Sequence, residues 1–311
     1  MQPTATKDEI INELELVCRT KGKKCLGPGA MSNFPDRFDG FHTYNRCCRT
    51  QHDKGRSKEN LKSYTKDRRA YEYWSDGNIH AANQFMGSEY FQDTSADHIG
   101  PISLGFIHDP RYIQQMDIRS NSAKRDRLQI EDIEKIIEIE NQTQICPVSC
   151  YSKIIWNHIK NNYDKNNIKK YNDILKQNIV NFMYILWFVM DSCQKKGEDV
   201  LVKIFLQPKF KYFKCTYKFS KVGAIIQESQ RNITQKSKTE IQRYCNIAIK
   251  SVNEYKDKNN RKYTHNLVPD ECNKLNKICN LINSNSSENC IRENIVSLLE
   301  TIQDRLIKNV L

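Results

Sequence analysis

Residues 96–128 read ADHIGPISLGFIHDPRYIQQMDIRSNSAKRDRL, and this stretch decides which fold we expect. An acid stands directly before a histidine, Asp97-His98, and in an extended strand two neighbouring side chains point to opposite faces. The loop through Pro110 lets the chain return, so that Asn121 is expected at the start of the next helix. The pattern therefore predicts a strand, a loop and a helix that bring Asp97, His98 and Asn121 together.

These residue types suit the hydrolysis of a phosphodiester. A hard divalent cation that neutralises a scissile phosphate takes oxygen ligands, and Asp97 and Asn121 supply a carboxylate and an amide oxygen. A neutral His98 is suited to take the proton of an attacking water near neutral pH. The other histidine of the stretch is His108. Because Asp109-Pro110 follows it and favours a turn, we expect His98 to be the base.

Basic residues follow Asn121. The apolar residues of 123–139 recur at helical spacing, so a periodic helix is expected there. Helix N-termini favour anions such as phosphate. We therefore expect Lys124, Arg125 and Arg127 to contact a DNA backbone without reading its bases.

The composition limits the class of protein. The chain has 311 residues with 49 Lys and Arg against 37 Asp and Glu, a net charge of +12, which favours a polyanionic partner. Mean hydropathy is −0.73, yet 12 Phe, 15 Tyr and 3 Trp are too many for a disordered chain. The N-terminus lacks the pattern of a signal peptide, and the most apolar stretch, 179–190, is too short to span a membrane. We expect a cytoplasmic protein with no membrane partner and a buried core helix at 179–190.

The cysteines allow two interpretations. The chain has 12 of them without a signal sequence, which argues against a disulfide framework. Cys18, Cys25, Cys47 and Cys48 are candidate ligands for a structural Zn²⁺, although adjacent cysteines fit one tetrahedral ion poorly. The alternative is that they are buried free thiols.

The fold class expected is α+β, mostly helical, with three segments. Residues 1–89 form an irregular Cys- and Arg-rich region, 90–141 the strand–loop–helix unit, and 146–311 a mainly helical domain. A short helix is expected at 59–74 within the first segment, and periodicity predicts helices at 167–193, 239–255 and 291–310. The β-forming runs 200–205 and 210–219 predict a hairpin broken at Pro208.

The stretch 96–128 resembles the HNH, or ββα-metal, nuclease finger, which has Asp-His-Ile-x-Pro, a loop, and an Asn on the closing helix. Many such fingers carry a further Asn or His within the loop, where this chain reads Tyr112-Ile113-Gln114-Gln115. The resemblance implies Asp97 and Asn121 as ligands of Mg²⁺ or Mn²⁺ and His98 as the general base.

The resemblance extends beyond the finger. Residues 25–49, 58–78 and 96–106 are similar to HNH-type type IIS restriction endonucleases, the group that includes BsaI and BsmBI. This implies a prokaryotic enzyme of a restriction–modification system that cuts double-stranded DNA. One finger cuts one strand, so a second subunit or a transient homodimer on DNA is expected.

Members of that group are longer at the N-terminus, so we expect this chain to be a truncated or split member that binds DNA with little sequence preference. Two alternatives follow. One is a DNA-binding subunit with weak or no cleavage alone, and the other is a standalone HNH nickase. Cleavage assays with and without the product of an adjacent gene discriminate between them.

Overall fold

The computed structural model describes residues 69–230, 235–257 and 263–310, together with 6, 8, 9, 12, 13, 16, 28–30, 41–45 and 67. The chain divides into two compact units. One comprises residues 1–64 with 260–262, and the other 65–259 with 263–311. In the first, β1 (Pro28–Ala30) pairs antiparallel with β2 (Phe41–Asn45). The predicted zinc ligands Cys18, Cys25, Cys47 and Cys48 lie outside the described residues.

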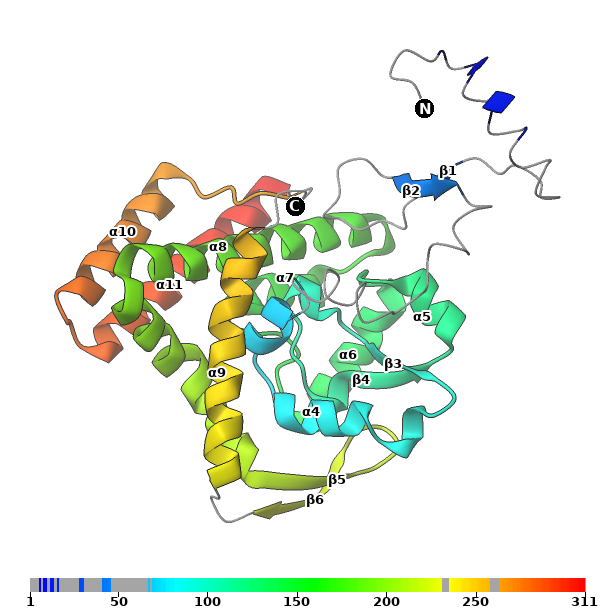
Figure 1. Ribbon diagram of the computed structural model, residues 1–311, viewed down its shortest axis with the longest axis horizontal. Coiled ribbons are helices and arrows are strands. Elements are labelled where there is room, and N and C mark those ends of the chain that lie inside the picture. Colours follow the sequence, from blue (N-terminus) through cyan, green and yellow to red (C-terminus); the bar gives the residue numbers. More distant parts are fainter. Residues whose placement is uncertain are drawn as a thin grey trace. The chain divides into compact units, whose positions relative to one another are not determined.

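The second unit is mostly helical with two small antiparallel sheets, which confirms the expected α+β class (Figure 1). In one sheet β3 (Ser95–His98) pairs with β4 (Ile113–Met116), and in the other β5 (Cys215–Phe219) pairs with β6 (Ile225–Gln230). The helices are α4 (Ile79–Met86), α5 (Ile118–Lys124), α6 (Ile130–Thr143), α7 (Lys153–Asn162), α8 (Ile168–Leu201), α9 (Gln235–Lys256), α10 (Pro269–Asn283) and α11 (Glu288–Val310).

Helix α8 forms the centre of the hydrophobic core. The stretch 179–190 is apolar on all sides, and eight of its side chains are buried (Ile179, Val180, Phe182, Met183, Ile185, Leu186, Val189 and Met190). Such a helix must be covered by others, and α9, α10 and α11 pack against it. The polar interruption Asn181 is also buried, and its amide exchanges hydrogen bonds with Asn266 at 2.8 and 3.0 Å. The prediction of a core helix is confirmed.

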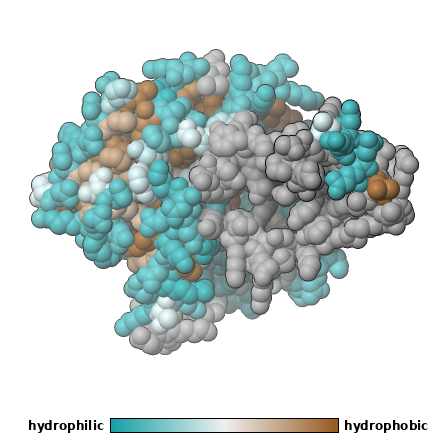
Figure 2. All heavy atoms as spheres, turned by 45° about the horizontal axis from the view of Figure 1, so that its top comes forward, coloured by the Kyte–Doolittle hydropathy of each residue, from teal (hydrophilic) through white to brown (hydrophobic). Residues whose placement is uncertain are grey.

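The described surface is mainly hydrophilic, in agreement with the low mean hydropathy of the sequence. Hydrophilic residues cover most of the described surface visible in Figure 2, with hydrophobic residues showing between them. None of the described helices is long and apolar enough to cross a membrane.

The domain boundary expected near residues 141–150 does not divide the second unit. The backbone N–H of Ile107 donates to Pro147 O at 2.9 Å, and Phe106 forms a β-bridge with Val148. The ring of Phe106 also packs edge-on against Trp156. Residues on both sides of the expected boundary thus share one core, and the division of the chain follows residue 64 instead.

The β-hairpin expected at 200–219 lies at residues 215–230. Residues 200–206 continue from α8 through one π-helical stretch, Val202–Leu206, with Ile204, Phe205 and Leu206 buried in the core. A 3₁₀ segment, Gln207–Lys214, contains Pro208. Short apolar runs do not by themselves distinguish a strand from a buried helix. The true turn uses Gly223, which has a φ of +75° that suits glycine.

The periodic segment 123–139 also differs from expectation, since two helices share it. Helix α5 ends at Lys124, and the next residue, Arg125, has a φ of 58°. Helix α6 begins at Ile130, where the Gln129 N–H donates to Asp132 Oδ2 at 2.9 Å and caps the helix. The predicted helix at 59–74 is described only at its end, where residues 69–74 are helical.

Candidate active site

The β3–β4 pair and α5 assemble the predicted site residues. Strand register places Asp97 opposite Gln114 and His98 opposite Ile113. Ser95 and Asp97 share one face of β3, because side chains alternate along a strand. Asn121 Nδ2 donates to the hydroxyl of Ser95, so that α5 brings Asn121 to the face that carries Asp97. Asn121 is the fourth residue of α5, not at its start as expected.

A local hydrogen bond stabilises the start of helix α5. Asp117 accepts a hydrogen bond from the Ser120 N–H at 2.9 Å, which caps the first turn. Because this cap stands directly after β4, the chain turns from strand to helix over one residue. The order strand, loop, strand, helix is therefore present as a compact unit of residues 95–124.

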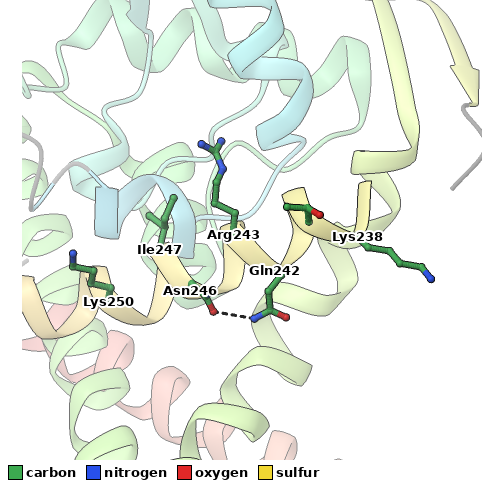
Figure 3. A pocket seen from close by; sticks show the side chains of 7 residues that line it. Lys238, Gln242, Arg243, Asn246, Ile247 and Lys250 are labelled. Atoms are coloured by element: carbon green, nitrogen blue, oxygen red, sulfur yellow. Dashed lines mark hydrogen bonds between the residues drawn. The ribbon is translucent and has the colours of Figure 1, made fainter. Parts of the chain in front are cut away.

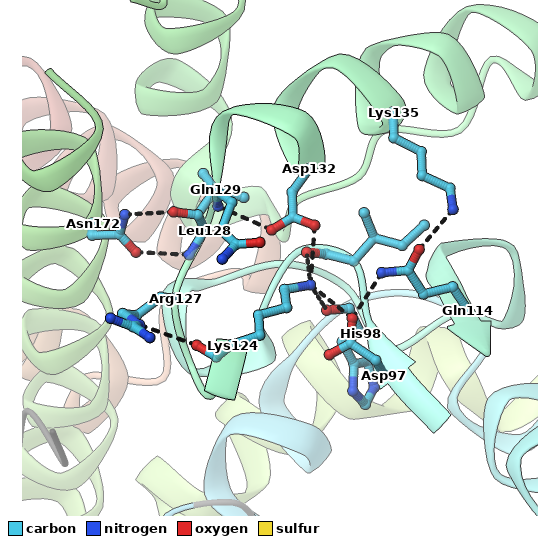
Figure 4. A network of polar contacts seen from close by, with 11 residues as sticks. Asp97, His98, Gln114, Lys124, Arg127, Leu128, Gln129, Asp132, Lys135 and Asn172 are labelled. Atoms are coloured by element: carbon cyan, nitrogen blue, oxygen red, sulfur yellow. Dashed lines mark hydrogen bonds and ion pairs between the residues drawn. The ribbon is translucent and has the colours of Figure 1, made fainter. Parts of the chain in front are cut away.

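A buried ion-pair network surrounds Asp97 (Figure 4). The Asp97 carboxylate accepts hydrogen bonds from Lys124 Nζ at 2.7 Å and Gln114 Nε2 at 2.8 Å. The same ammonium lies 3.1 Å from Asp132 Oδ1 and donates to His98 O and Ile99 O at 3.1 and 2.9 Å. Burial in this network raises the pKa of the Asp132 carboxyl, and the charge of Lys124 opposes the shift.

Lys124 differs from the sequence expectation, because its side chain is turned inward instead of facing DNA. The residue is 3% exposed, and its ammonium contacts two buried carboxylates. A lysine carries its charge into the interior only where carboxylates and carbonyls replace the lost water. In this position Lys124 holds Asp97 and the end of β3 in place.

The other two basic residues remain on the surface. Arg125 and Arg127 are both exposed. Arg127 Nε donates to Lys124 O at 3.1 Å and its Nη2 to Ala123 O, so this guanidinium also caps the C-terminus of α5. Arg125 makes the weakest contact with the end of the helix among the three basic residues, a long hydrogen bond from Nε to Ser122 O at 3.4 Å.

The two histidines of the stretch lie against each other. His98 Nε2 and His108 Nδ1 are 2.7 Å apart. His108 is fully buried, whereas His98 is half-buried. Sequence reasoning set His108 aside as a rival base, and its actual place is beside the proposed base. A histidine in a turn gives no sequence signal of such a contact.

The loop that carries His108 is rigidly held. Asp109 is 0% exposed, accepts a hydrogen bond from Asn78 N at 3.1 Å, and binds the Arg111 guanidinium through two contacts of 2.6 Å. The hydrogen bond to Asp109 raises the pKa of Arg111 further. Tyr112 O accepts from Ile99 N at 3.0 Å and closes the loop where the two strands meet. The Asp109-Pro110 turn expected from the sequence is present as the 3₁₀ segment Pro110–Tyr112.

Metal-ligand groups are sparse in the part of the chain that the structure describes. No three His, Cys, Asp or Glu side chains there are grouped so as to hold a metal ion. Cys146 and Cys150 are free thiols, and burial raises the pKa of each. A metal at Asp97 would therefore have to take amide, water or phosphate oxygens as its other ligands.

A separate hollow of about 610 Å³ lies along α9 (Figure 3). Among its lining residues, Gln242 Nε2 donates to Asn246 Oδ1 at 2.9 Å. Its described lining has cations and amides but no carboxylate or histidine, so it suits an anion better than a metal or a proton-transfer step. The residues are Lys238, Thr239, Gln242, Arg243, Asn246, Ile247 and Lys250.

Comparison with known families decides the class of enzyme. Residues 11–311 match the family model described as type II restriction endonuclease (RE_Alw26IDE). The chain belongs to this family. No curated protein and no solved structure matches it.

Family membership fixes the general activity. A type II restriction endonuclease is a site-specific deoxyribonuclease of a restriction–modification system, so DNA is the substrate of this enzyme. The positive net charge of +12 agrees with a polyanionic substrate. Three residues to which the sequence assigned no role, Gln114, Asp132 and His108, contact the predicted site residues of this endonuclease or the lysine that holds them. Gln114 had one signal, since it lies in the stretch 112–115, where the resemblance to HNH fingers leads to the expectation of an Asn or His.

Proposed function

We propose that this restriction endonuclease is a Mg²⁺-dependent enzyme of the HNH type whose active site is the unit of β3, β4 and α5. One observation carries the proposal: Asp97 and His98 end a strand that pairs with β4, and the following helix ties Asn121 to Ser95 on the same strand. This is the order of elements that a ββα-metal finger requires. The resemblance to the type IIS group of BsaI and BsmBI supports a cut at an offset from the recognition site.

The donor set fits a hard divalent cation. Asp97 offers a carboxylate, and because Asn121 uses its amide nitrogen on Ser95, its oxygen is the atom left to bind a cation. Mg²⁺ is commonly held by one or two such protein ligands together with water and substrate phosphate, so a third acid is not required. When bound, the ion neutralises charge that develops on the phosphate and on the departing 3′ oxygen.

His98 acts as the general base. Its half-buried ring takes one proton from a water molecule while that water's oxygen forms a bond to phosphorus. The bond from phosphorus to the 3′ oxygen breaks, which leaves a 5′-phosphate and a 3′-hydroxyl. His98 and Asp97 point to opposite faces of β3, so the base and the cation do not compete for one place.

The surrounding charges position the DNA. Arg125 and Arg127 are exposed beside the site and bind the phosphate backbone without reading bases. Lys124 acts indirectly by holding Asp97. Since the described residues form one such unit, cleavage of both strands needs a second copy on the DNA or two successive nicks.

Cleavage of supercoiled plasmid by the purified chain, with Mg²⁺ and with chelator, tests the proposal. His98→Ala should lower the cleavage rate by roughly 10²–10⁴ while DNA affinity is retained, because only proton transfer is lost. Asp97→Ala should abolish Mg²⁺-dependent cleavage. The control is His265→Ala, which removes an imidazole stacked on Tyr184. Cleavage by His98→Ala at the wild-type rate would refute the assignment.

A further inference from the structure

The contact between His98 and His108 is the starting point. Nε2 of His98 lies 2.7 Å from Nδ1 of His108, and the ring centroids are 5.0 Å apart. Two neutral imidazole nitrogens at this distance share one hydrogen, so that one donates and the other accepts. Which of them donates is fixed by the second nitrogen of His108.

That second nitrogen faces acceptors. His108 Nε2 lies 3.2 Å from Asn83 Oδ1 and 3.6 Å from the Glu72 carboxylate. An amide oxygen and a carboxylate accept hydrogen bonds, so Nε2 of His108 carries the hydrogen. In the neutral ring Nδ1 then holds the lone pair, and it accepts the hydrogen on His98 Nε2. Nδ1 of His98 is consequently the unprotonated nitrogen.

The backbone keeps His108 in this place. Its N–H donates to Asp76 O at 3.2 Å. Gly77, at a φ of +101°, approaches so closely that a Cβ there would lie 2.9 Å from His108 O. With the side chain 0% exposed and the next residue, Asp109, also buried, the ring has little freedom to turn. His108 is thus held more firmly than the half-buried His98 that it contacts.

We infer that His108 is a positioning residue for the cleavage reaction, which fixes the ring of His98 and keeps the lone pair on His98 Nδ1. This rests on the proposed role of His98 as the general base. A base of fixed tautomer presents its lone pair to water in every molecule, whereas a free ring spends part of its time turned or with the hydrogen on the other nitrogen. His108 itself touches neither water nor phosphate in this role.

The tautomers can be measured without any cleavage assay. Long-range ¹H–¹⁵N correlation spectra of the full chain, labelled at histidine, should show both His98 and His108 with hydrogen on Nε2. The Nε2 proton of His98 should be observable because the hydrogen bond protects it, and in His108→Leu it should be lost to solvent exchange. A wild-type His98 with its hydrogen on Nδ1 would overturn the inference, as would an unchanged His98 spectrum in His108→Leu.

Kinetics give a second readout. His108→Leu should lower kcat about tenfold to a hundredfold, the cost typical of removing a partner that orients a reacting side chain, with KM for DNA nearly unchanged. His108→Asn should restore much of kcat, because its amide oxygen can accept from His98. If Leu at this buried site prevents folding, His108→Asn and Asn83→Leu carry the comparison. His265→Leu, which removes an exposed imidazole stacked on Tyr184, is the control for a histidine substitution away from the site.

The two proposals fail differently. If the wild type does not cleave DNA, the nuclease assignment fails, and the spectra still decide the tautomer. If the wild type cleaves, His98→Ala does not, and His108→Leu cleaves at the wild-type rate, the positioning role is wrong and the assignment of His98 stands.

Discussion

Replacing Lys124 by methionine tests the buried network directly. Methionine has a similar length and lacks the charge, so the change removes an ammonium that lies 2.7 Å from Asp97 Oδ2 and 3.1 Å from Asp132 Oδ1. Both carboxylates belong to residues that are 6% exposed, and each would lose its cation. Breaking a buried ion pair by removing one partner costs about 3–5 kcal/mol in the free energy of unfolding.

The contacts of Lys124 determine how much free energy of unfolding the variant should lose. The carbonyls of His98 and Ile99 also lose a donor, which adds to the cost, while protonation of the orphaned carboxyls limits it. We therefore expect a loss of about 3–5 kcal/mol. In a domain of this size that corresponds to a fall in Tm of roughly 6–20 °C, at about 2–4 °C per kcal/mol.

Urea unfolding followed by circular dichroism measures the loss. Lys135→Met is the matched control: it is the same substitution on an exposed lysine whose Nζ donates to Gln114 Oε1 at 2.6 Å, and it should cost no more than about 0.5 kcal/mol. Adding Asp132→Asn to Lys124→Met should recover part of the loss, because one orphaned carboxylate is removed. If Lys124→Met is no more destabilising than Lys135→Met, the ammonium is not buried between the carboxylates and the reasoning fails.

Three further predictions follow from the same region. Arg125→Gln should reduce the slope of log affinity against log salt by about one, as expected for one lost phosphate contact; an unchanged slope in a filter-binding titration would remove Arg125 from the DNA interface. Gly100→Ala should cost about 1–3 kcal/mol in unfolding free energy, because a Cβ there would lie 2.2 Å from the ring of Phe106. Gly87→Ala, with its nearest neighbour at 3.5 Å, is the control, and equal thermal melts of the two variants would contradict the packing. Burial raises the folded pKa of Asp132, so its contribution to stability is present below the unfolded pKa of about 4 and is lost as the pH rises through the folded value. The free energy of unfolding of Asp132→Asn should therefore increase relative to that of the wild type as the pH rises from about 4. Unfolding curves that show no such trend would argue against the raised pKa of Asp132.

Local patterns predicted the elements whose cause is local. The apolar stretch 179–190 had to be a covered helix, and burial of its side chains confirms this. The periodic segments 239–255 and 291–310 lie within α9 and α11. A stripe of apolar residues at helical spacing favours a helix that packs this stripe against the core. The strand at Asp97 and His98 and the turn at Asp109-Pro110 were likewise set by neighbouring residues.

Elements of ambiguous pattern were decided by packing. Residues 200–205 are a run of β-forming residues like a strand, but they continue from α8, and Ile204, Phe205 and Leu206 are buried in the core. Periodicity alone also joined α5 to α6. Their separation depends on Arg125 with its positive φ and on Lys124, whose side chain must leave the helix toward Asp97.

For the site, the sequence by itself predicted the candidate residues: Asp97, His98 and Asn121 have side chains of the types that we propose for phosphodiester hydrolysis. Only the tertiary structure decided what surrounds them. In the sequence Lys124 is one cation in a basic run, and such runs usually face water. It is buried because Asp97 and Asp132, from β3 and α6, converge on one point and together outweigh the cost of removing an ammonium from water. The contact between His108 and His98 was likewise decided by the tertiary structure. It depends on how the loop folds back, and the residues next to either histidine in the sequence do not predict it.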